Sequence, residues 1–150
     1  MSLRYLLDTT VVSSPVSRIP NTEIVSRLDR HGHECAIAAP VWHELQYGLH
    51  RLPRSKRRTT LENYLRNVVQ PSFPILSYDE VAAAWHGRQR AHLEAFGRPA
   101  PYADGQIAAI AHVNGLVLVT SNTKDFSGFK ELVVEDWSMP RVRLHRKPKE

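Results

Sequence analysis

Residues 101–126 read PYADGQIAAIAHVNGLVLVTSNTKDF and carry the clearest structural signals in the chain. Apolar residues leave so little polar surface over 102–113 that the helix predicted there must be well buried. Asn114 and Gly115 end this helix. A continuous apolar run, LVLVT at 116–120, then predicts a strand that is covered on both faces.

The same alternation continues outward from this stretch. Short apolar runs are separated by segments with helical spacing, which is typical of a parallel sheet with helices on both faces. We therefore expect an α/β fold with three layers, α/β/α, and a mostly parallel central sheet. The other expected strands are 3–7, 35–38, 75–77 and 131–135, and the other expected helices are 21–31, 40–51, 55–68 and 79–96.

Length and composition favour one domain, 1–138, followed by a basic tail, 139–150. The last ten residues hold five Lys or Arg and one Glu, which leaves 15 basic and 14 acidic residues in the nearly neutral remainder. A second basic run lies at 51–58; such runs attract polyanions, although a solvated loop and a frayed tail explain them equally well. A single cysteine, Cys35, and the lack of an apolar run long enough for a membrane span predict a cytoplasmic protein.

Acidic residues follow two of the expected strands. Asp8 ends the run YLLDTTVV (5–12), and Asp125 lies in the loop after 116–120. Ligands bind beyond the carboxyl ends of parallel strands, so Asp8 and Asp125 are candidate site residues. Asp104 lies in the first turn of its helix and Glu44 beside an apolar helix face. Taken alone, Asp104 is better explained as a helix-capping acid and Glu44 as a solvent-facing helix acid.

Considered together, these acids indicate a metal site. Several carboxylates in close proximity repel one another, and a hard divalent cation removes that penalty. Mg²⁺, or Mn²⁺ in its place, prefers oxygen ligands, keeps several waters and reaches substrate phosphates through one or two carboxylates. Such an arrangement suits the hydrolysis of a phosphodiester.

Four stretches carry a resemblance to a known family. The chain resembles the PIN-domain family, specifically the VapC/FitB-like toxins of type II toxin–antitoxin systems. This resemblance implies a PIN-like fold, a Mg²⁺-dependent endoribonuclease that hydrolyses RNA, a cognate antitoxin and a homodimer. The matching stretches are YLLDTTVVS (5–13), AAPVWHELQYGLHRLP (38–53), PYADGQIAAIAHVNGLVLVTSNTKDF (101–126) and ELVVEDW (131–137).

The resemblance also implies roles for individual residues. Asp8 and Asp104 are the principal metal ligands, and Glu44 completes the acidic cluster directly or through metal-bound water. Where the family often has Asp, two residues after the Thr that ends the strand, this chain has Asn122. Asn122 brings no charge, and Asp125 can supply the carboxylate instead, so the fourth position stays open between the two.

Thr10 occupies a position where the family often has Asn or Ser, and its hydroxyl is expected to hydrogen-bond Asp8 or a phosphate oxygen. Two other classes remain as alternatives. Asn122 in place of an acid suits a catalytically weak scaffold that binds RNA or regulates. A phosphatase or a receiver-like signalling protein would be phosphorylated on Asp8, but such proteins normally carry a second acid near position 10.

Overall fold

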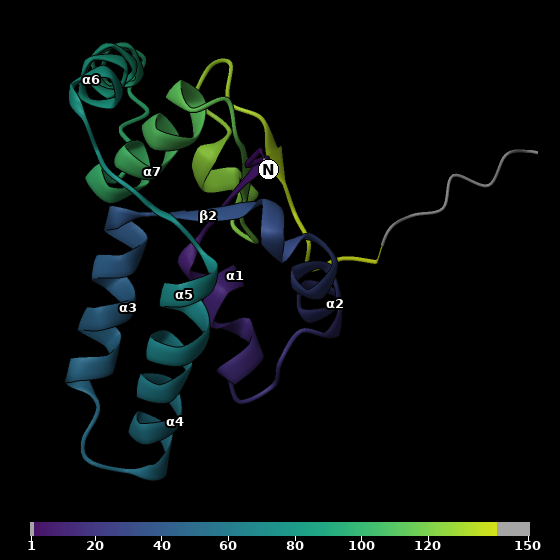
Figure 1. The fold of residues 1–150 in the computed structure, drawn as a ribbon. Helices are drawn as coiled ribbons and strands as arrows, with labels where there is room; N and C mark the ends of the chain where they lie inside the picture. Colours follow the sequence, from purple (N-terminus) through teal and green to yellow (C-terminus); the bar gives the residue numbers. More distant parts are fainter. Residues whose placement is uncertain (1, 141–150) are drawn as a thin grey trace, which may run out of the picture.

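The computed structural model describes residues 2–140 and is built on a five-stranded, wholly parallel sheet (Figure 1). Its strand order is β3-β2-β1-β4-β5, so the first strand lies at the centre. This confirms the expected α/β class with a mostly parallel sheet. The strands are β1 (Tyr5–Leu7), β2 (Cys35–Ala38), β3 (Ile75–Leu76), β4 (Val117–Val119) and β5 (Val134–Glu135).

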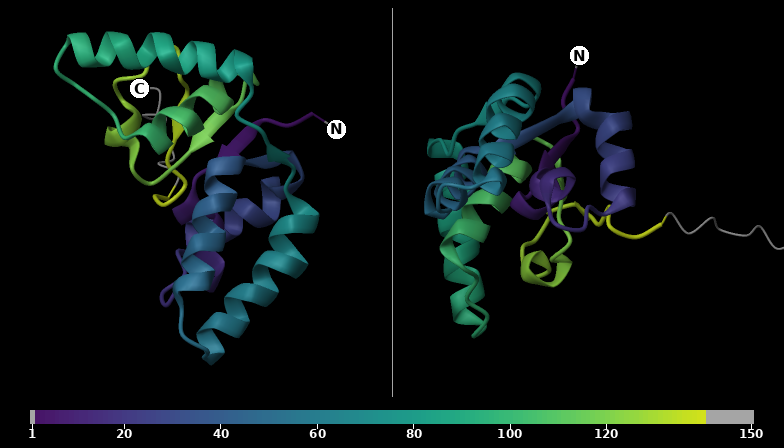
Figure 2. Two further views of the ribbon diagram at one scale, coloured as in Figure 1. Left: turned by 90° about the vertical axis from the view of Figure 1, so that its left-hand side faces the viewer. Right: turned by 90° about the horizontal axis from the view of Figure 1, so that it is seen from below.

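Helices cover both faces of the sheet. Helix α7 packs on β4 and supports α6, while α2 and the α4–α5 run line a common cavity on the other face (Figures 1 and 2). Helices α3 and α4 form a hairpin that projects beyond the sheet (Figure 2, left). The helices are α1 (Thr9–Ser13), α2 (Thr22–His31), α3 (Ala39–Arg51), α4 (Lys56–Tyr64), α5 (Gln70–Ser72), α6 (Glu80–Ala95) and α7 (Tyr102–Val113).

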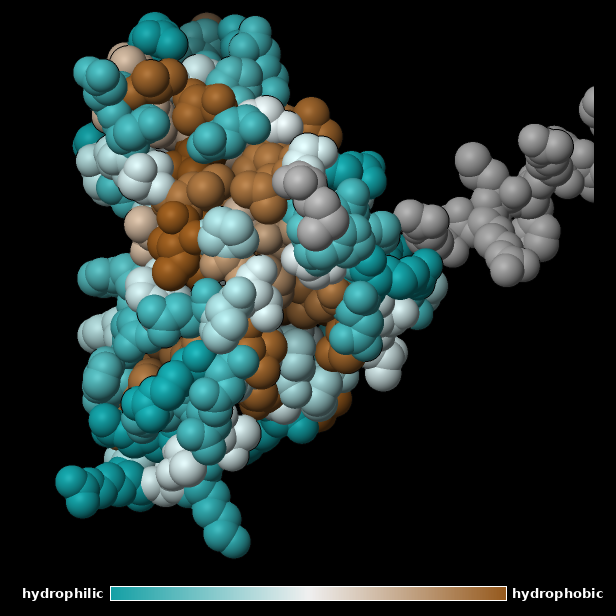
Figure 3. Space-filling view, viewed as in Figure 1, coloured by the Kyte–Doolittle hydropathy of each residue, from teal (hydrophilic) through white to brown (hydrophobic). Residues whose placement is uncertain are grey.

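The central strands and α7 form the core, as their apolar sequences predict. Every residue of β1 and β2 is buried, and six of the twelve residues of α7 are buried, namely Gly105 and Ile107–Ala111. On the face shown in Figure 3, hydrophobic residues gather over α6, α7 and the chain joining α5 to α6. The surface of the α3–α4 hairpin on the same face is mostly hydrophilic. Among the described residues, no helix combines the length and apolar character that a membrane span requires.

Several element boundaries differ from the sequence expectations. Helix α1 was not expected, because its β-branched run TTVV has low helix propensity; burial of Val11 and Val12 and the Asp8 cap stabilise it. The helix expected over 55–68 becomes π-helical at Leu65–Val69 and continues to Ser72. The strand expected over 131–135 shortens to two residues, since Glu131 has a left-handed φ of 65°.

The end of the described chain is fixed to α2. The buried Arg27 side chain donates to the backbone oxygens of Asp136 (3.5 Å) and Met139 (3.1 Å), and Asn21 Nδ2 donates to Ser138 O at 3.2 Å. These bonds hold the segment that precedes the expected domain boundary at 138. Most of the expected basic tail, 141–150, lies outside the described residues, and the boundary stays a prediction.

Candidate metal and catalytic site

The carboxyl edge of the sheet brings side chains from distant parts of the sequence together. Asp8 directly follows β1 and Thr120 directly follows β4, and these two strands are neighbours in parallel register. The backbone N–H of Asp8 donates to Val119 O at 2.9 Å, which fixes the two strand ends against each other. Helices α3 and α7 and the short 3-10 helix Thr123–Phe126 contribute the remaining acids.

Asp8 is buried and held by two hydrogen bonds. Its Oδ1 accepts from the backbone N–H of Thr9 at 2.8 Å, which caps α1, and its Oδ2 accepts from Thr120 Oγ1 at 2.8 Å. Burial raises the pKa of Asp8, the two hydrogen bonds oppose that rise, and the charges of Glu44 and Asp125 add to it. Each carboxylate oxygen keeps a lone pair for a further partner.

Asp104 lies in the first turn of α7, partly buried. Burial and the negative charges of Asp8, Asp125 and Glu44, in that order, raise its pKa to about 6. The helix begins after Pro101 without a side-chain cap, and within residues 2–140 the Asp104 carboxylate makes no hydrogen bond. The capping interpretation therefore finds no support, and the carboxylate is left facing other acids.

Glu44 is positioned by a hydroxyl. Its Oε2 accepts a hydrogen bond from Thr9 Oγ1 at 2.6 Å, which links α3 to α1. Its charge contributes to the raised pKa of both Asp8 and Asp104. The solvent-facing alternative is thus only partly right: Glu44 is exposed, but it borders the site.

The loop after β4 carries both residues considered for the fourth position of the site, Asn122 and Asp125. Asp125 acts on the pKa of both Asp8 and Asp104. Asn122 is exposed, and its backbone N–H donates to Thr120 Oγ1 at 3.0 Å, so it stabilises the turn that holds the hydroxyl. The structure brings together four acids, Asp8, Glu44, Asp104 and Asp125, which we call the four-acid site.

The threonines of the site differ from the expectation. Within the described chain, Thr10 makes no side-chain hydrogen bond, and Asp8 accepts from Thr9 and Thr120; of the two partners expected for Thr10, the phosphate oxygen stays a prediction. Thr9 and Thr120 make the contacts instead. Sequence reasoning missed both roles. Thr120 carried a usable signal, since it is a hydroxyl at the end of a buried strand next to the strand that ends at Asp8.

The donor set fits a hard cation that keeps water in its shell. Every acid here offers oxygen ligands, and the carboxylates repel one another. A bound cation would relieve that repulsion. Over residues 2–140, however, no group of three or more His, Cys, Asp or Glu side chains is spaced to hold an ion unaided. This arrangement suits Mg²⁺ held by one or two carboxylates and water, and it does not suit a closed structural site such as zinc requires.

Comparisons with known proteins agree with this architecture. The PIN domain family model matches residues 5–132. The chain is 33% identical to Toxin FitB of Neisseria gonorrhoeae over 135 residues, 88% of this chain and 97% of that protein. It is 31% identical to Ribonuclease VapC2 of Haemophilus influenzae over 136 residues, 90% and 98% of the two chains.

Solved structures give the same relationship. The FitAcB structure from Neisseria gonorrhoeae superposes with a TM-score of 0.79 at 32% identity, covering 87% of this chain and 95% of that one. DNA-bound VapBC from Salmonella typhimurium has a TM-score of 0.78 at 28% identity and covers 90% and 98% of the two chains.

Proposed function

Because this chain belongs to the PIN domain family and is similar over most of its length to VapC and FitB toxins, we propose that it is a Mg²⁺-dependent endoribonuclease. It hydrolyses RNA phosphodiesters as the toxin of a toxin–antitoxin pair. The observation that carries the proposal is the four-acid site, in which burial and the charges of the three other carboxylates raise the pKa of Asp104 to about 6.

In this proposal, two acids bind the ion and two threonines orient one of them. Asp8 and Asp104 would hold the ion, which would polarise a phosphoryl oxygen and lower the pKa of a bound water. The hydroxyl of Thr120 fixes the orientation of Asp8 Oδ2, and the backbone of Thr9 fixes Oδ1. Such a preset geometry reduces the reorganisation needed during reaction.

Glu44 and Asp125 border this pair. The hydroxyl of Thr9 holds Glu44 Oε2, so Oε1 stays available to accept a hydrogen bond from the attacking water. Asp125 completes the negative charge of the site. Asn122 acts through the turn that holds Thr120.

Cleavage of a structured RNA by the purified protein tests the proposal. We expect cleavage with Mg²⁺, none with EDTA, and its loss in Asp8→Asn and Asp104→Asn. Asp29→Asn is the matched control, because Asp29 is an exposed acid on α2 and lies outside the four-acid site. No cleavage of any RNA by the wild-type protein would contradict the enzyme.

Asn122, which stands where an acid is often found, favours a second candidate function: a catalytically weak scaffold that acts as an RNA-binding or regulatory module. The same variants separate the two. RNA binding that is unchanged in Asp8→Asn, together with no wild-type cleavage, would support the scaffold. Cleavage that depends on Asp8 would exclude it.

We also assign two protein partners and a compartment to this proposal. An antitoxin is supported by the solved relatives, which include FitAB bound to a DNA fragment and DNA-bound VapBC. A homodimer is supported by exposed apolar side chains, among them Val81 (58%) and Tyr102 (54%). Co-purification with the product of a neighbouring small reading frame tests the first, and light scattering of the isolated protein tests the second. Action in the cytoplasm suits an RNA substrate and a single buried thiol, Cys35.

A further inference from the structure

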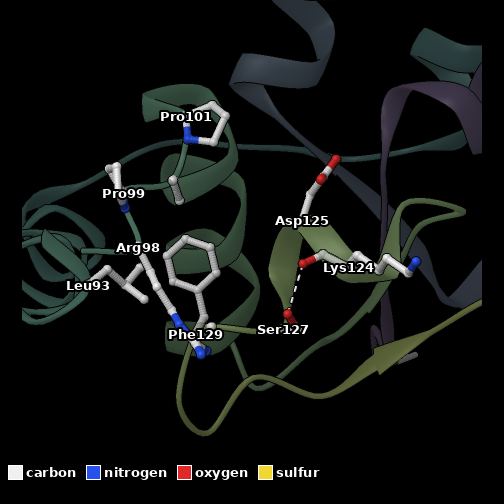
Figure 4. A pocket seen from close by; sticks show the side chains of 10 residues that line it. Leu93, Arg98, Pro99, Pro101, Lys124, Asp125, Ser127 and Phe129 are labelled. Carbon is white, nitrogen blue, oxygen red and sulfur yellow. Dashed lines mark hydrogen bonds between the residues drawn. The ribbon is translucent and has the colours of Figure 1, made fainter. Parts of the chain in front are cut away.

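A cavity of about 260 Å³ opens directly beside the four-acid site. We call it the Arg98 pocket; its lining includes Leu93, Arg98, Pro99, Pro101, Asp125 and Phe129 (Figure 4). Asp125 is shared with the four-acid site, and Pro101 immediately precedes α7, whose first turn carries Asp104. A group bound in this cavity therefore lies next to the acids.

The backbone places Arg98 at the rim of this cavity. Gly97 ends α6 with a left-handed φ of 68°, a conformation that glycine adopts without strain. Gly97 N donates to Glu94 O at 3.0 Å and Arg98 N donates to Leu93 O at 2.8 Å, which closes the end of the helix. Pro99 restricts the backbone of the residue before it, which is Arg98, so the position of Arg98 is set by a rigid turn.

Arg98 brings a positive charge that has no internal partner. In the part of the chain that the structure describes, its guanidinium forms no hydrogen bond and no ion pair, whereas Arg66 and Arg90 each pair with a Glu four residues away. Figure 4 shows the ammonium group of Lys124 and the carboxylate of Asp125 directed away from Arg98. Arg98 is thus the cation of this pocket, and Asp125 serves the neighbouring acids.

The rest of the pocket is suited to an uncharged group. The side chains of Leu93, Phe129 and the two prolines form an apolar wall. The volume is below the roughly 300–1,000 Å³ of pockets for drug-sized ligands, which limits the occupant to about one nucleotide. Beyond Thr9 and Glu44 a second cavity opens, so a strand that leaves the Arg98 pocket has a path across the site.

We infer that the Arg98 pocket is a subsite for the nucleotide adjacent to the scissile phosphate, an assignment that rests on the proposed ribonuclease function. The Arg98 guanidinium binds a backbone phosphate of the RNA strand, and the apolar wall receives the attached ribose and base. Guanidinium is the group best matched to a phosphate in two-point contact. Its charge also offsets the repulsion between RNA and the four acids.

RNA binding without metal tests this assignment separately from cleavage. The probe is fluorescein-labelled oligo(U) RNA in EDTA, with affinity measured by anisotropy over a series of salt concentrations. Arg98→Ala should weaken binding and reduce the slope of log affinity against log salt by about 0.7, the value of one phosphate contact on a single strand. Arg30→Ala, which removes an exposed charge from α2 and lies outside the proposed path of the strand, should leave the slope unchanged.

Arg98→Lys separates charge from geometry, since it should keep the slope while binding more weakly than wild type. If Arg98→Ala matches Arg30→Ala in both affinity and slope, the subsite is refuted, while wild-type binding still supports the proposed function. If the wild-type protein neither binds nor cleaves RNA, both the subsite and the proposed function fall.

Discussion

Replacing Asp104 with Asn should make the folded protein more stable while it abolishes cleavage. The folded-state pKa of Asp104 is raised from 3.8 to about 6 by burial and by three neighbouring acids. A rise of that size corresponds to roughly 3 kcal/mol of preference for the neutral carboxyl. Because Asp104 is only partly buried, solvent screening reduces the expected effect on stability to about 1–2 kcal/mol.

The sign of the effect on stability follows from the direction in which the pKa of Asp104 is shifted. Below about pH 4, Asp104 is neutral in both the folded and the unfolded protein, and the ionisation penalty is absent. As pH rises through the folded pKa near 6, Asp104 ionises among other acids and the wild-type protein loses this stability. Asn carries no charge at any pH, so Asp104→Asn should gain its full advantage above pH 6 and lose it near pH 4.

Thermal unfolding in EDTA at pH 4, 5, 6 and 7.5 measures this difference. A gain of about 1–2 kcal/mol corresponds to a rise in Tm of roughly 2–8 °C for a chain of this size. Asp29→Asn is the control and should leave Tm unchanged at each pH. An Asp104→Asn variant that is less stable than wild type at pH 7.5, or equally shifted at every pH, would refute the clustering of acids.

Three further changes follow from the same contacts. Thr120→Val removes the donor to Asp8 Oδ2 in a fully buried position, and urea unfolding should show a loss of about 1–3 kcal/mol; an unchanged midpoint would contradict the bond. Gly105→Ala would drive its new methyl group into the His86 ring, and Tm should fall by the equivalent of about 1–3 kcal/mol, with partial recovery when His86→Ala is added. Mg²⁺ should raise the Tm of the wild-type protein by binding the folded state but not that of Asp8→Asn; equal shifts in both would place the ion elsewhere.

Local signals predicted the central part of the fold well. The strands at β1 and β2 and the buried helix α7 were expected within two residues of their observed bounds, because each is apolar over its whole length. The cap of α2 is equally local: Asn21 Oδ1 accepts from Ile24 N at 3.0 Å. These features depend on neighbours in the sequence, which is why the sequence alone predicts them.

Features that depend on distant contacts were missed. The helix α1 forms from a run that favours strands, since its two valines are fully buried by the rest of the fold. The hydrogen bond from Thr120 to Asp8 joins residues 112 positions apart, so it depends on the pairing of β1 with β4. The effect of the Asp125 charge on the pKa of Asp104 depends on the fold, which brings the loop after β4 close to Asp104.

The carboxyl signal of Asp104 in a ¹³C NMR titration is the most direct measurement of whether the acids form one site. We expect an apparent pKa of about 6 in the metal-free protein, a lower value in Asp8→Asn, and a marked fall when Mg²⁺ is added. A pKa near 4 that responds neither to Asp8→Asn nor to Mg²⁺ would contradict the account.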